Sequence, residues 1–563
     1  MLAAFLLMNA VFFELIDRAD RFGKSSVGEL IMTIRPVILA AILACAFSIT
    51  ACSDAPDNAR TLHRGNSDEP LTLDPHKVAM LIETTVINDL FEGLYTLSAN
   101  GRAIPGLALT ADVSDDGLIW RFHLRETVWS DGHPLTAGDV AAGMQRAVDP
   151  ATLNETASKY FFIENAMEVI AGDLPPDRLG VIVIDDLTLE IRLDYPVPYV
   201  SDFLAYNSYP LPRHVFDVVG DAWVRPEHMV TNGPYTLTEW RSVNFIELSA
   251  NPNFHAAETL CFDTVFVYPT TDRGAAERRV RSGELDLNVD IEPSNIGFLR
   301  ANHPELLHES GSFRADDFLF NTTRPPFDDA RVRQAFSLAV DRRFLAENVL
   351  GGAVEPSWRM IAPALPGTDQ NVGLDYADTD MDVRRARART LLVEAGYGPD
   401  NPLDVMFSYV TAFGRSAPVI QQDISLIAPW VSVEMQVSDS QLHYAAMRAG
   451  DFMFGNNAWM PEYPDPYGAL LIWETRAGDL NYSRWTNADY DRLVDTALRT
   501  VDSTIRTSTL GDAERILLRE MPHMPLYRPL NFDLVRPDIV GWTANPTQQN
   551  PSRWLCRAPA TDD

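Results

Sequence analysis

The sequence predicts an α/β fold. In the second half of the chain, β-prone runs alternate with helix-prone stretches: strands are expected at 403–410, 431–437 and 452–456, and helices at 416–427 and 440–449. Such alternation is typical of a sheet whose strands are joined by helical crossovers, with ligands bound where strand ends face a cleft. The first half contributes a strand–turn–helix pattern. A length of 563 residues allows two or three domains.

The strand–turn–helix pattern lies in residues 120–148. Apolar and polar residues alternate from 120 to 124, which predicts a half-buried strand. A Ser-Asp-Gly turn follows, in which Gly132 is free to adopt a positive φ. Thr136 is expected to cap the helix, with Asp139 in its first turn as a short version of the capping box. The helix is expected to run through Val148 and to end at the following Asp-Pro.

Further elements follow from the same signals. A strand is expected at 62–65, and a helix is expected to end at Gly93. The stretch 181–193 has the pattern of a hairpin with an acidic turn, and 235–240 has that of a strand. A helix is expected to end at Gly283 and to lead into a strand.

Three helices are expected in the region 328–396. Asp328 or Asp329 is expected to cap the first, and Asp341 the second. The third, 382–395, is basic and amphipathic and is expected to end at Gly396. Its arginines at 384, 385, 387 and 389 are interpreted as a solvated face rather than an anion site.

The composition argues against several classes of function. The net charge is −32, and residues 1–51 are balanced, so the whole acidic excess lies after them. A protein this acidic has little attraction for nucleic acid or anionic lipid surfaces, and the charge is interpreted as a solubility feature. The sequence also lacks the nucleophile-elbow, zinc-protease, Cys-x-x-Cys, dinucleotide and P-loop motifs. We therefore expect no enzyme, no cofactor and no metal site.

The N-terminus predicts export. Arg35 gives a positive start, residues 37–47 an apolar core, and Ile49-Thr50-Ala51-Cys52 a lipobox-like end. Residues 1–31 are expected to be an extension from a misplaced start codon, 32–51 a lipoprotein signal peptide, and 52–58 a polar tether. Cys52 is the expected lipidation site, with Cys45 a poorer candidate. Cys261 and Cys556 then remain as an even pair in an oxidising compartment.

Several motifs together resemble one family. They are Leu73-Asp74-Pro75-His76-Lys77, Asp89-Leu90-Phe91-Glu92-Gly93-Leu94, Trp129-Ser130-Asp131-Gly132, Thr231-Asn232-Gly233-Pro234-Tyr235 and Arg281-Ser282-Gly283-Glu284-Leu285-Asp286. In this order they resemble the periplasmic oligopeptide- and dipeptide-binding proteins, the family 5 solute-binding subunits of ABC importers. The resemblance runs from about Leu62 to the C-terminus.

The resemblance implies a periplasmic-binding-protein-like fold, a two-lobe hinged clamp with an additional inserted domain. Lobe one would combine 59–91, 231–314 and 530–563, the inserted domain 92–230, and lobe two 315–529. The implied function is capture of oligopeptides or dipeptides by hinge closure and delivery to a membrane permease. The implied partners are a peptide, the permease and ATPase subunits, and the membrane through the lipid anchor alone, with the protein acting as a periplasmic monomer.

The resemblance also implies site residues. Ala79, Met80 and Leu81 align with the segment of lobe one that runs along the ligand, and Ala458, Trp459 and Met460 with that of lobe two. Glu462 aligns with an aspartate that holds the α-ammonium of the peptide, and Arg415 is a candidate replacement cation. Ala79 stands where relatives are acidic and Asn456 where they have arginine, so peptide length and the handling of its C-terminus stay open.

Both remaining cysteines map to lobe one by resemblance, which implies a Cys261–Cys556 disulfide. Relatives carry nickel chelates, haem, opines or oligosaccharides on the same scaffold, so a non-peptide solute remains an alternative ligand. An extracytoplasmic enzyme or chaperone on this scaffold is the alternative of another class.

Overall fold

The computed structural model describes residues 60–461 and 463–559. Its largest sheet has twelve strands, and one group of them comes mostly from the first half of the chain. This group consists of β1 (Thr61–Gly65), β10 (Tyr235–Arg241), β11 (Phe245–Ala250), β12 (Thr264–Tyr268), β13 (Leu287–Val289) and β14 (Leu307–Gly311). β1 pairs in parallel with both β12 and β13, as expected of strands joined by crossovers.

The second group of strands is β15 (Ala315–Phe320), β16 (Val354–Pro356), β17 (Leu403–Val410), β18 (Val431–Ser438) and β19 (Phe454–Trp459). β17 pairs in parallel with both β18 and β19, while β15 is antiparallel to β19. The predicted alternation of strands and crossover helices in this region is confirmed.

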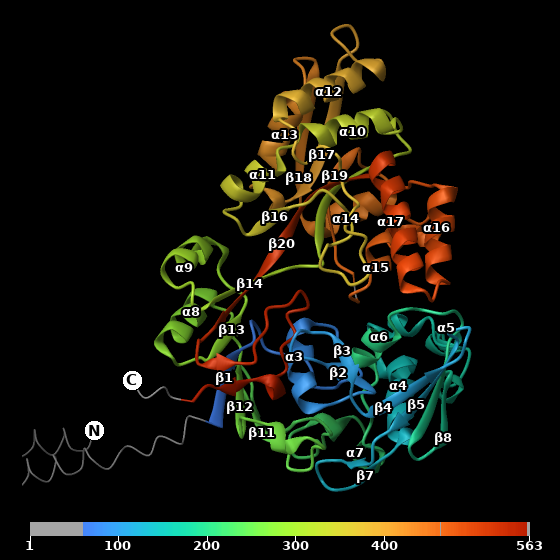
Figure 1. Ribbon diagram of the computed structural model, residues 1–563, viewed down its shortest axis with the longest axis vertical. Helices are drawn as coiled ribbons and strands as arrows, with labels where there is room; N and C mark the ends of the chain where they lie inside the picture. The colour runs from blue at the N-terminus through green and yellow to red at the C-terminus, as the bar shows by residue number, and fades with distance from the viewer. Residues whose placement is uncertain (1–59, 462, 560–563) are drawn as a thin grey trace, which may run out of the picture. The chain divides into compact units, whose positions relative to one another are not determined.

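One long strand belongs to both groups. β20 (His523–Val535) pairs with β15 and β16 through its first residues and with β14 and β13 through its last. Figure 1 shows it as the red arrow between the two groups. The order along the sheet is β10-β11-β12-β1-β13-β20-β15-β19-β17-β18, with β14 and β16 beside β20. The two groups of strands are therefore connected by one continuous strand.

Four smaller sheets complete the strand inventory of the described residues. The largest is antiparallel, β4-β5-β9-β8, and its strands all lie within the expected inserted segment 92–230. Its strands are β4 (Ala108–Val113), β5 (Ile119–Leu124), β8 (Val181–Asp185) and β9 (Thr188–Arg192). The other three sheets have two strands each: β2 (Tyr95–Leu97) with β3 (Ala103–Pro105), β6 (Thr127–Val128) with β7 (Pro134–Leu135), and β21 (Ile539–Val540) with β22 (Cys556–Arg557). The lobe boundaries themselves stay a proposal.

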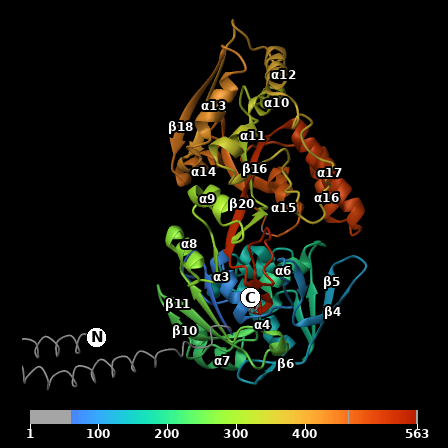
Figure 2. The same cartoon turned by 60° about the vertical axis from the view of Figure 1, so that its left-hand side comes forward.

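The structure has a helix at each expected place and adds others that the sequence analysis did not predict. In the first half they are α3 (Leu81–Leu90), α4 (Ala137–Val148), α5 (Ala166–Ile170), α6 (Val200–Asn207), α7 (Arg213–Val219), α8 (Arg273–Ser282) and α9 (Ile296–Asn302). In the second half they are α10 (Ala330–Ala339), α11 (Arg342–Phe344), α12 (Met381–Glu394), α13 (Ala417–Ser425), α14 (Ser440–Ala449), α15 (Tyr467–Leu470), α16 (Ala488–Leu498) and α17 (Ser503–Glu520). Figure 2 shows α13 beside β18 and α17 beside α16.

Local signals act as predicted in several places. The carboxylate of Asp139 accepts from the Thr136 N–H at 2.8 Å and so caps α4. Asp329, not Asp328, caps α10 through the Arg331 N–H. Gly132 adopts φ +86°, a conformation that glycine reaches without strain.

Two predicted boundaries are wrong. α3 ends at Leu90 rather than at Gly93, because the chain turns to extended geometry at Phe91. A Cβ on Gly93 would lie 2.6 Å from the Ser208 hydroxyl, so this glycine permits a close approach rather than a helix stop. β19 runs from 454 to 459 instead of 452 to 456, because its pairing with β15 continues to its last residue.

The arginine-rich helix α12 is not simply a solvated face. Arg384 is buried, donates to the Val340 carbonyl at 2.7 Å and lies over the Trp358 ring. Arg389 donates to the Ile427 carbonyl at 2.7 Å. These two guanidinium groups therefore attach α12 to neighbouring segments by hydrogen bonds, which the sequence pattern of the helix does not predict.

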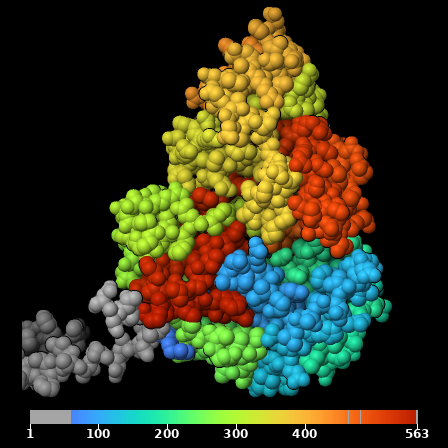
Figure 3. Space-filling view, in the orientation of Figure 1, coloured from blue at the N-terminus to red at the C-terminus, as the bar shows by residue number. Residues whose placement is uncertain are grey.

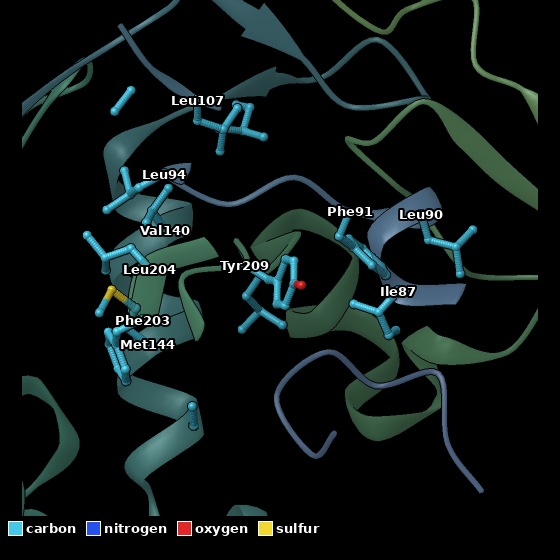
Figure 4. Close-up of a cluster of buried hydrophobic side chains, with 14 of the residues drawn as sticks. Ile87, Leu90, Phe91, Leu94, Leu107, Val140, Met144, Phe203, Leu204 and Tyr209 are labelled. Atoms are coloured by element: carbon cyan, nitrogen blue, oxygen red, sulfur yellow. The ribbon is translucent and has the colours of Figure 1, made fainter. Parts of the chain in front are cut away.

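A common core joins the first strand group to the inserted segment. Figure 4 shows side chains of α3, α4 and α6 gathered in one cluster. Its labelled members are Ile87, Leu90, Phe91, Leu94, Leu107, Val140, Met144, Phe203, Leu204 and Tyr209, all of them buried. These helices therefore share one close-packed hydrophobic core.

The C-terminal segment is tied back to the start of the described chain. Asp89 accepts from the N–H and the hydroxyl of Ser552 at 2.8 and 2.6 Å, and Arg64 donates to the same hydroxyl at 2.7 Å. A disulfide joins Cys261 to Cys556, as expected, with 5.1 Å between their Cα atoms. In Figure 3 the red C-terminal segment lies between the green and blue segments of this group.

Candidate functional site

A pocket of about 180 Å³ brings together segments that are far apart in the sequence. One wall comes from residues 75–84, which lead into α3. The second comes from the inserted segment, and the third from the loop that follows β19. The lining residues lie within 75–84, 154–160 and 206–207 and at positions 460, 461, 463 and 464, together with Phe313 and Thr547.

The first wall is anchored by a buried ion pair. The guanidinium of Arg146, on α4, donates to both carboxylate oxygens of Asp74 at 2.8 Å and to Nδ1 of His76 at 3.0 Å. Since Arg146 can only donate, Nδ1 of His76 must accept, and its Nε2–H donates to the Tyr209 carbonyl at 3.0 Å. Burial lowers the pKa of His76 to about 4, so this ring is neutral at pH 7.

This arrangement depends on a glycine in α4. A Cβ on Gly143 would lie 2.1 Å from the Tyr209 carbonyl oxygen and 2.8 Å from Nε2 of His76. Only glycine allows the helix to approach the wall this closely. His76 is thus part of a buried cross-link rather than an ordinary loop histidine.

The start of α3 carries its own cap. One carboxylate oxygen of Glu83 accepts from the N–H groups of Ala79 and Met80 at 3.0 and 3.1 Å, and the other accepts from Leu71 at 3.3 Å. Glu83 is buried in the first turn of α3, where a negative charge interacts favourably with the positive end of the helix dipole. The Leu81 N–H, at the first helical position, has no acceptor within the helix.

The second wall is held by one hydrogen bond to the first wall and by two within the inserted segment. The Thr156 hydroxyl donates to the Val78 carbonyl at 3.3 Å. The Asn154 amide donates to the Ala147 carbonyl at 2.8 Å, at the end of α4. The Tyr160 hydroxyl donates to the Asn207 carbonyl at 2.7 Å.

The third wall is shaped by aromatic side chains. The Trp459 indole N–H donates to the Gly468 carbonyl at 2.7 Å and so closes the loop that follows β19. Tyr463 stacks on Tyr199 with 5.2 Å between ring centroids and meets the edge of Phe203 at 5.9 Å. The loop of the second strand group therefore contacts the inserted segment directly.

Four of the residues expected at the site line this pocket: Ala79, Met80, Leu81 and Met460. Glu462 and the lipidation candidate Cys52 lie outside the described residues. The neighbours of Glu462 in the chain, Pro461 and Tyr463, both line the pocket.

Four other expected residues lie elsewhere. Ala458 and Trp459 are paired with β15 at the end of β19. Asn456 is fully buried in the same strand, where its side-chain oxygen accepts from the Val410 N–H at 2.8 Å. Arg415 donates to the Val349 carbonyl. None of the four is among the described residues that line the pocket, and their roles stay proposals.

The sequence reasoning missed the contribution of the inserted segment. Thr156, Lys159, Tyr160, Tyr206 and Asn207 all line the pocket, although no motif marks them. One sequence signal could have pointed to these residues. The segment follows directly on α4, and the start of α4 belongs to a stretch that resembles the family.

A second, larger pocket of about 410 Å³ adjoins the first. Leu81 lines both pockets. The larger pocket is also lined by Pro529–Phe532 of β20, by Ala353 and by Asp290. The larger pocket therefore lies beside the strand that joins the two strand groups.

Two kinds of site are not found in the described part of the chain. It contains no cluster of three or more His, Cys, Asp or Glu side chains that could hold a metal ion. Nor does any helix within residues 60–461 and 463–559 combine the length and apolar character that a membrane span requires.

The fold and the pocket define a ligand-binding protein of the two-lobe clamp type. The model of the bacterial extracellular solute-binding proteins, family 5 Middle, matches residues 102–481. The chain belongs to this family, whose members are binding proteins rather than enzymes.

Three known proteins illustrate the likeness. The probable deoxycholate-binding periplasmic protein YgiS of Escherichia coli is 32% identical over 506 residues, 87% of this chain and 93% of YgiS. The unliganded open form of the periplasmic murein tripeptide-binding protein MppA has a TM-score of 0.83 at 30% identity, covering 88% of this chain and 97% of MppA. OppA of Haemophilus influenzae in complex with the peptide RPPGFSPFR has a TM-score of 0.68 at 26% identity, covering 89% and 100%. This chain therefore resembles the unliganded open form more than the peptide complex.

Proposed function

We propose that the protein is the substrate-binding subunit of a peptide ABC importer. It captures oligopeptides or dipeptides by hinge closure outside the cytoplasmic membrane and delivers them to a permease. The relatives named above support the ligand class, since MppA is named for a murein tripeptide and OppA was solved with a peptide. A lipid on Cys52 keeps the protein at the membrane, where its partners are.

The observation that carries this proposal is the position of residues 79–81. They line the same pocket as Met460, which belongs to the second segment, 458–460, that the family resemblance sets along the ligand. The side chains of Met80, Leu81 and Met460 are 38%, 44% and 50% exposed, which leaves apolar surface for a ligand to cover.

The backbone chemistry limits how a peptide can pair with the first wall. Glu83 already occupies the N–H groups of Ala79 and Met80, so these two cannot donate to a ligand. The N–H groups of Leu81 and Ile82, in the first turn of α3, have no acceptor within the helix and remain as donors for a peptide carbonyl. Binding by an added strand is therefore restricted to a short register, and side-chain contacts supply the rest.

Hinge closure has support in the connectivity. β20 is the strand that both strand groups share, so bending near its middle changes their separation without breaking either half of the sheet. Its middle residues, Pro529 and Leu530, line the larger pocket, so a ligand there contacts the hinge itself.

Glu462 is the proposed anchor for the α-ammonium of the peptide. A buried ammonium–carboxylate pair that loses one partner leaves the other desolvated, which weakens binding by roughly a hundredfold or more. Calorimetry should show this loss for Glu462→Gln with trialanine, and wild-type protein should bind N-acetyl-trialanine equally poorly. Glu434→Gln, on the exposed strand β18, is the matched control and should bind normally. Equal affinity for free and acetylated peptide would remove Glu462 from the site.

An amphipathic organic acid is the second candidate ligand. The relative YgiS is named as probably deoxycholate-binding, and the apolar side chains at 80, 81 and 460 suit a steroid face. Titration with deoxycholate beside trialanine separates the two, because each candidate predicts a different preferred probe.

A further inference from the structure

The larger pocket, of about 410 Å³, carries charge of one sign. Asp290 is the one charged residue among the described residues that line it, and none of these is lysine, arginine or histidine. Every residue next to them in the sequence also lies within the described ranges, 60–461 and 463–559. The pocket therefore presents a carboxylate to a ligand, and none of its described lining residues presents a cation.

The partners of the Asp290 carboxylate gather at one of its two oxygens. Nε and Nη2 of Arg273 lie 2.8 Å from Oδ2, and the Ser67 hydroxyl donates to the same oxygen at 3.1 Å. The Arg273 side chain is 44% exposed and does not line the pocket, so this ion pair is a weak surface pair. Oδ1 of Asp290 accepts no hydrogen bond from the described residues and remains for a ligand.

A second carboxyl group lies behind this wall. Asp533, on β20, is buried and stands opposite Val289, the residue before Asp290, in the pairing of β20 with β13. Its Oδ1 accepts no hydrogen bond from the described residues. Burial raises the pKa of Asp533 to about 7 against the opposing effect of a hydrogen bond from Gln548, and the charge of Asp290 adds to the rise. The two carboxyl groups are therefore close enough to repel each other.

The groups that face Asp533 leave an excess of negative charge. Arg64, on β1, is the cation that acts on it, but Arg64 also lies 3.6 Å from the carboxylate of Asp89 on α3. His308 stands opposite Asp533 on β14, and burial lowers the pKa of its ring, so it is neutral at pH 7. One guanidinium is thus shared by two buried carboxyl groups, and a cation beside Asp290 would reduce their repulsion.

The remaining walls of the larger pocket are mostly apolar. They include Leu81, Ile82, Ile291, Ile296, Leu530 and Phe532. A lysine or arginine side chain combines an apolar stem with a charged head, so its methylene groups suit these walls while its head reaches Asp290. A small inorganic cation would leave the apolar walls uncovered. The lining therefore favours an alkylammonium or alkylguanidinium group.

The backbone around the pocket is held in an unusual shape. Ser67, Asp290 and Gln548 line it with φ angles of +60°, +70° and +53°, and they are three of the eight residues other than glycine with positive φ in the described chain. Such conformations are strained and persist where the surrounding structure enforces them, often at ligand sites. The wall that carries Asp290 is therefore set before a ligand arrives.

We propose that the larger pocket binds a basic side chain of the ligand, with its ammonium or guanidinium group on Asp290. The inference rests on the proposed function and adds the ligand class, peptides that contain lysine or arginine. The α-ammonium of a peptide and a free diamine carry the same kind of charge, so the experiment has an arm for each source.

The test compares charged and uncharged stems by calorimetry. The probes are trialanine peptides with one lysine at the first, second or third position, each beside its norleucine counterpart, which keeps most of the stem and lacks the charge. At least one lysine peptide should bind the wild type roughly tenfold more tightly than its counterpart. The α-ammonium is common to both peptides of a pair, so it does not contribute to this difference.

Two variants locate the charge that causes the preference. Asp290→Asn should abolish it, and the wall should keep its shape because asparagine tolerates a positive φ. Asp538→Asn is the matched control, since Asp538 is 33% exposed against 34% for Asp290, also pairs with arginine and lines neither pocket. This control should keep the preference of the wild type.

The outcomes separate this inference from the proposed function. Peptide binding without a lysine preference, or with the same preference in wild type and Asp290→Asn, overturns the role of Asp290 and leaves peptide capture standing. Binding of the diamine cadaverine but of no peptide, weakened by Asp290→Asn, supports the cation site and overturns peptide capture. Binding of deoxycholate alone, or of none of these probes, overturns both.

Proton release on wild-type protein provides a measurement that needs no variant. The charge of Asp290 raises the pKa of Asp533, so a cation paired with Asp290 acts on Asp533 in the opposite sense and lowers that pKa. At pH 7 the preferred lysine peptide should therefore release more protons on binding than its norleucine counterpart. Calorimetry in phosphate and in Tris buffer measures the difference, and equal release by the two peptides, or net uptake with lysine, would contradict a cation at this place.

Discussion

Replacing Arg146 by methionine tests whether a buried ion pair holds the first wall of the pocket. The side chains of Arg146 and Asp74 are 8% and 5% exposed, whereas that of Asp221, the second partner of Arg146, is 72% exposed. Removing one member of a buried pair typically costs about 3–5 kcal/mol, because the other charge stays desolvated. The exposed pair with Asp221 adds at most about 1 kcal/mol. We therefore expect a loss of about 3–5 kcal/mol in the free energy of unfolding at pH 7.

The pH dependence of this loss has a definite sign. In the wild type the pKa of Asp74 is lowered, since the hydrogen bonds and charge of Arg146 outweigh burial. Its contribution to stability is thus present above the unfolded pKa of about 3.9 and is lost as the pH falls through the lower folded value. In the variant, burial without Arg146 raises the pKa of Asp74, so the penalty is largest near pH 7 and shrinks as Asp74 takes up a proton.

Urea unfolding followed by tryptophan fluorescence measures this change across a pH series. Arg492→Met is the matched control, because Arg492 and its partner Asp489 are both mostly exposed, and it should change stability by less than about 1 kcal/mol. The double variant Asp74→Asn/Arg146→Met should recover part of the loss, since no buried charge remains. A loss below about 1 kcal/mol at pH 7, or one that does not shrink between pH 7 and pH 4, refutes the reasoning.

Three further predictions concern stability and anchoring. Gly143→Ala should destabilise the protein by at least about 2 kcal/mol, since its Cβ would lie 2.1 Å from a backbone carbonyl oxygen. Gly297→Ala is the control and should be tolerated, because no atom lies within 4 Å of the added Cβ. Equal melting temperatures for the two variants would contradict the packing argument. Thiol titration of the denatured, unreduced mature protein should find neither Cys261 nor Cys556 free, and reduction should lower stability by on the order of 5 kcal/mol for a loop of 295 residues; two titrating thiols would exclude the disulfide in solution. Cys52→Ser should release the protein from membranes into the soluble fraction, and wild-type protein already found there would rule out the lipid anchor.

Local sequence signals were sufficient for the elements that begin at a cap, follow a turn or show a clear periodicity. The helix caps at Thr136 and Asp329 and the positive φ at Gly132 depend on groups within about four residues, and each acts as predicted. The prediction that a helix ends at Gly93 was wrong. This glycine is needed instead for the close approach of Ser208, which lies more than a hundred positions away in the sequence. Such a contact leaves no periodic pattern in the sequence.

The residues of the pocket also divide into those that the sequence predicted and those that it did not. Residues 79–81 and Met460 were expected from the family-like wording, and the structure brings them to one pocket. Lys159 and Asn207 were not expected, because the inserted segment reaches the pocket only through the packing of α4 and α6 on a common core.

By itself, the sequence determined the α/β class, the family, and the positions of those helices and strands that carry a clear local signal. These depend on periodicity, capping and turn chemistry, or on the wording of short motifs, and all of them act over a few neighbouring residues. The tertiary structure decided that His76 is neutral and buried in a hydrogen-bonded cross-link, that Arg384 attaches α12 to its neighbours, and that Lys159 lines a pocket. Each of these depends on burial and on groups contributed by distant segments, and burial is a property of the folded chain as a whole.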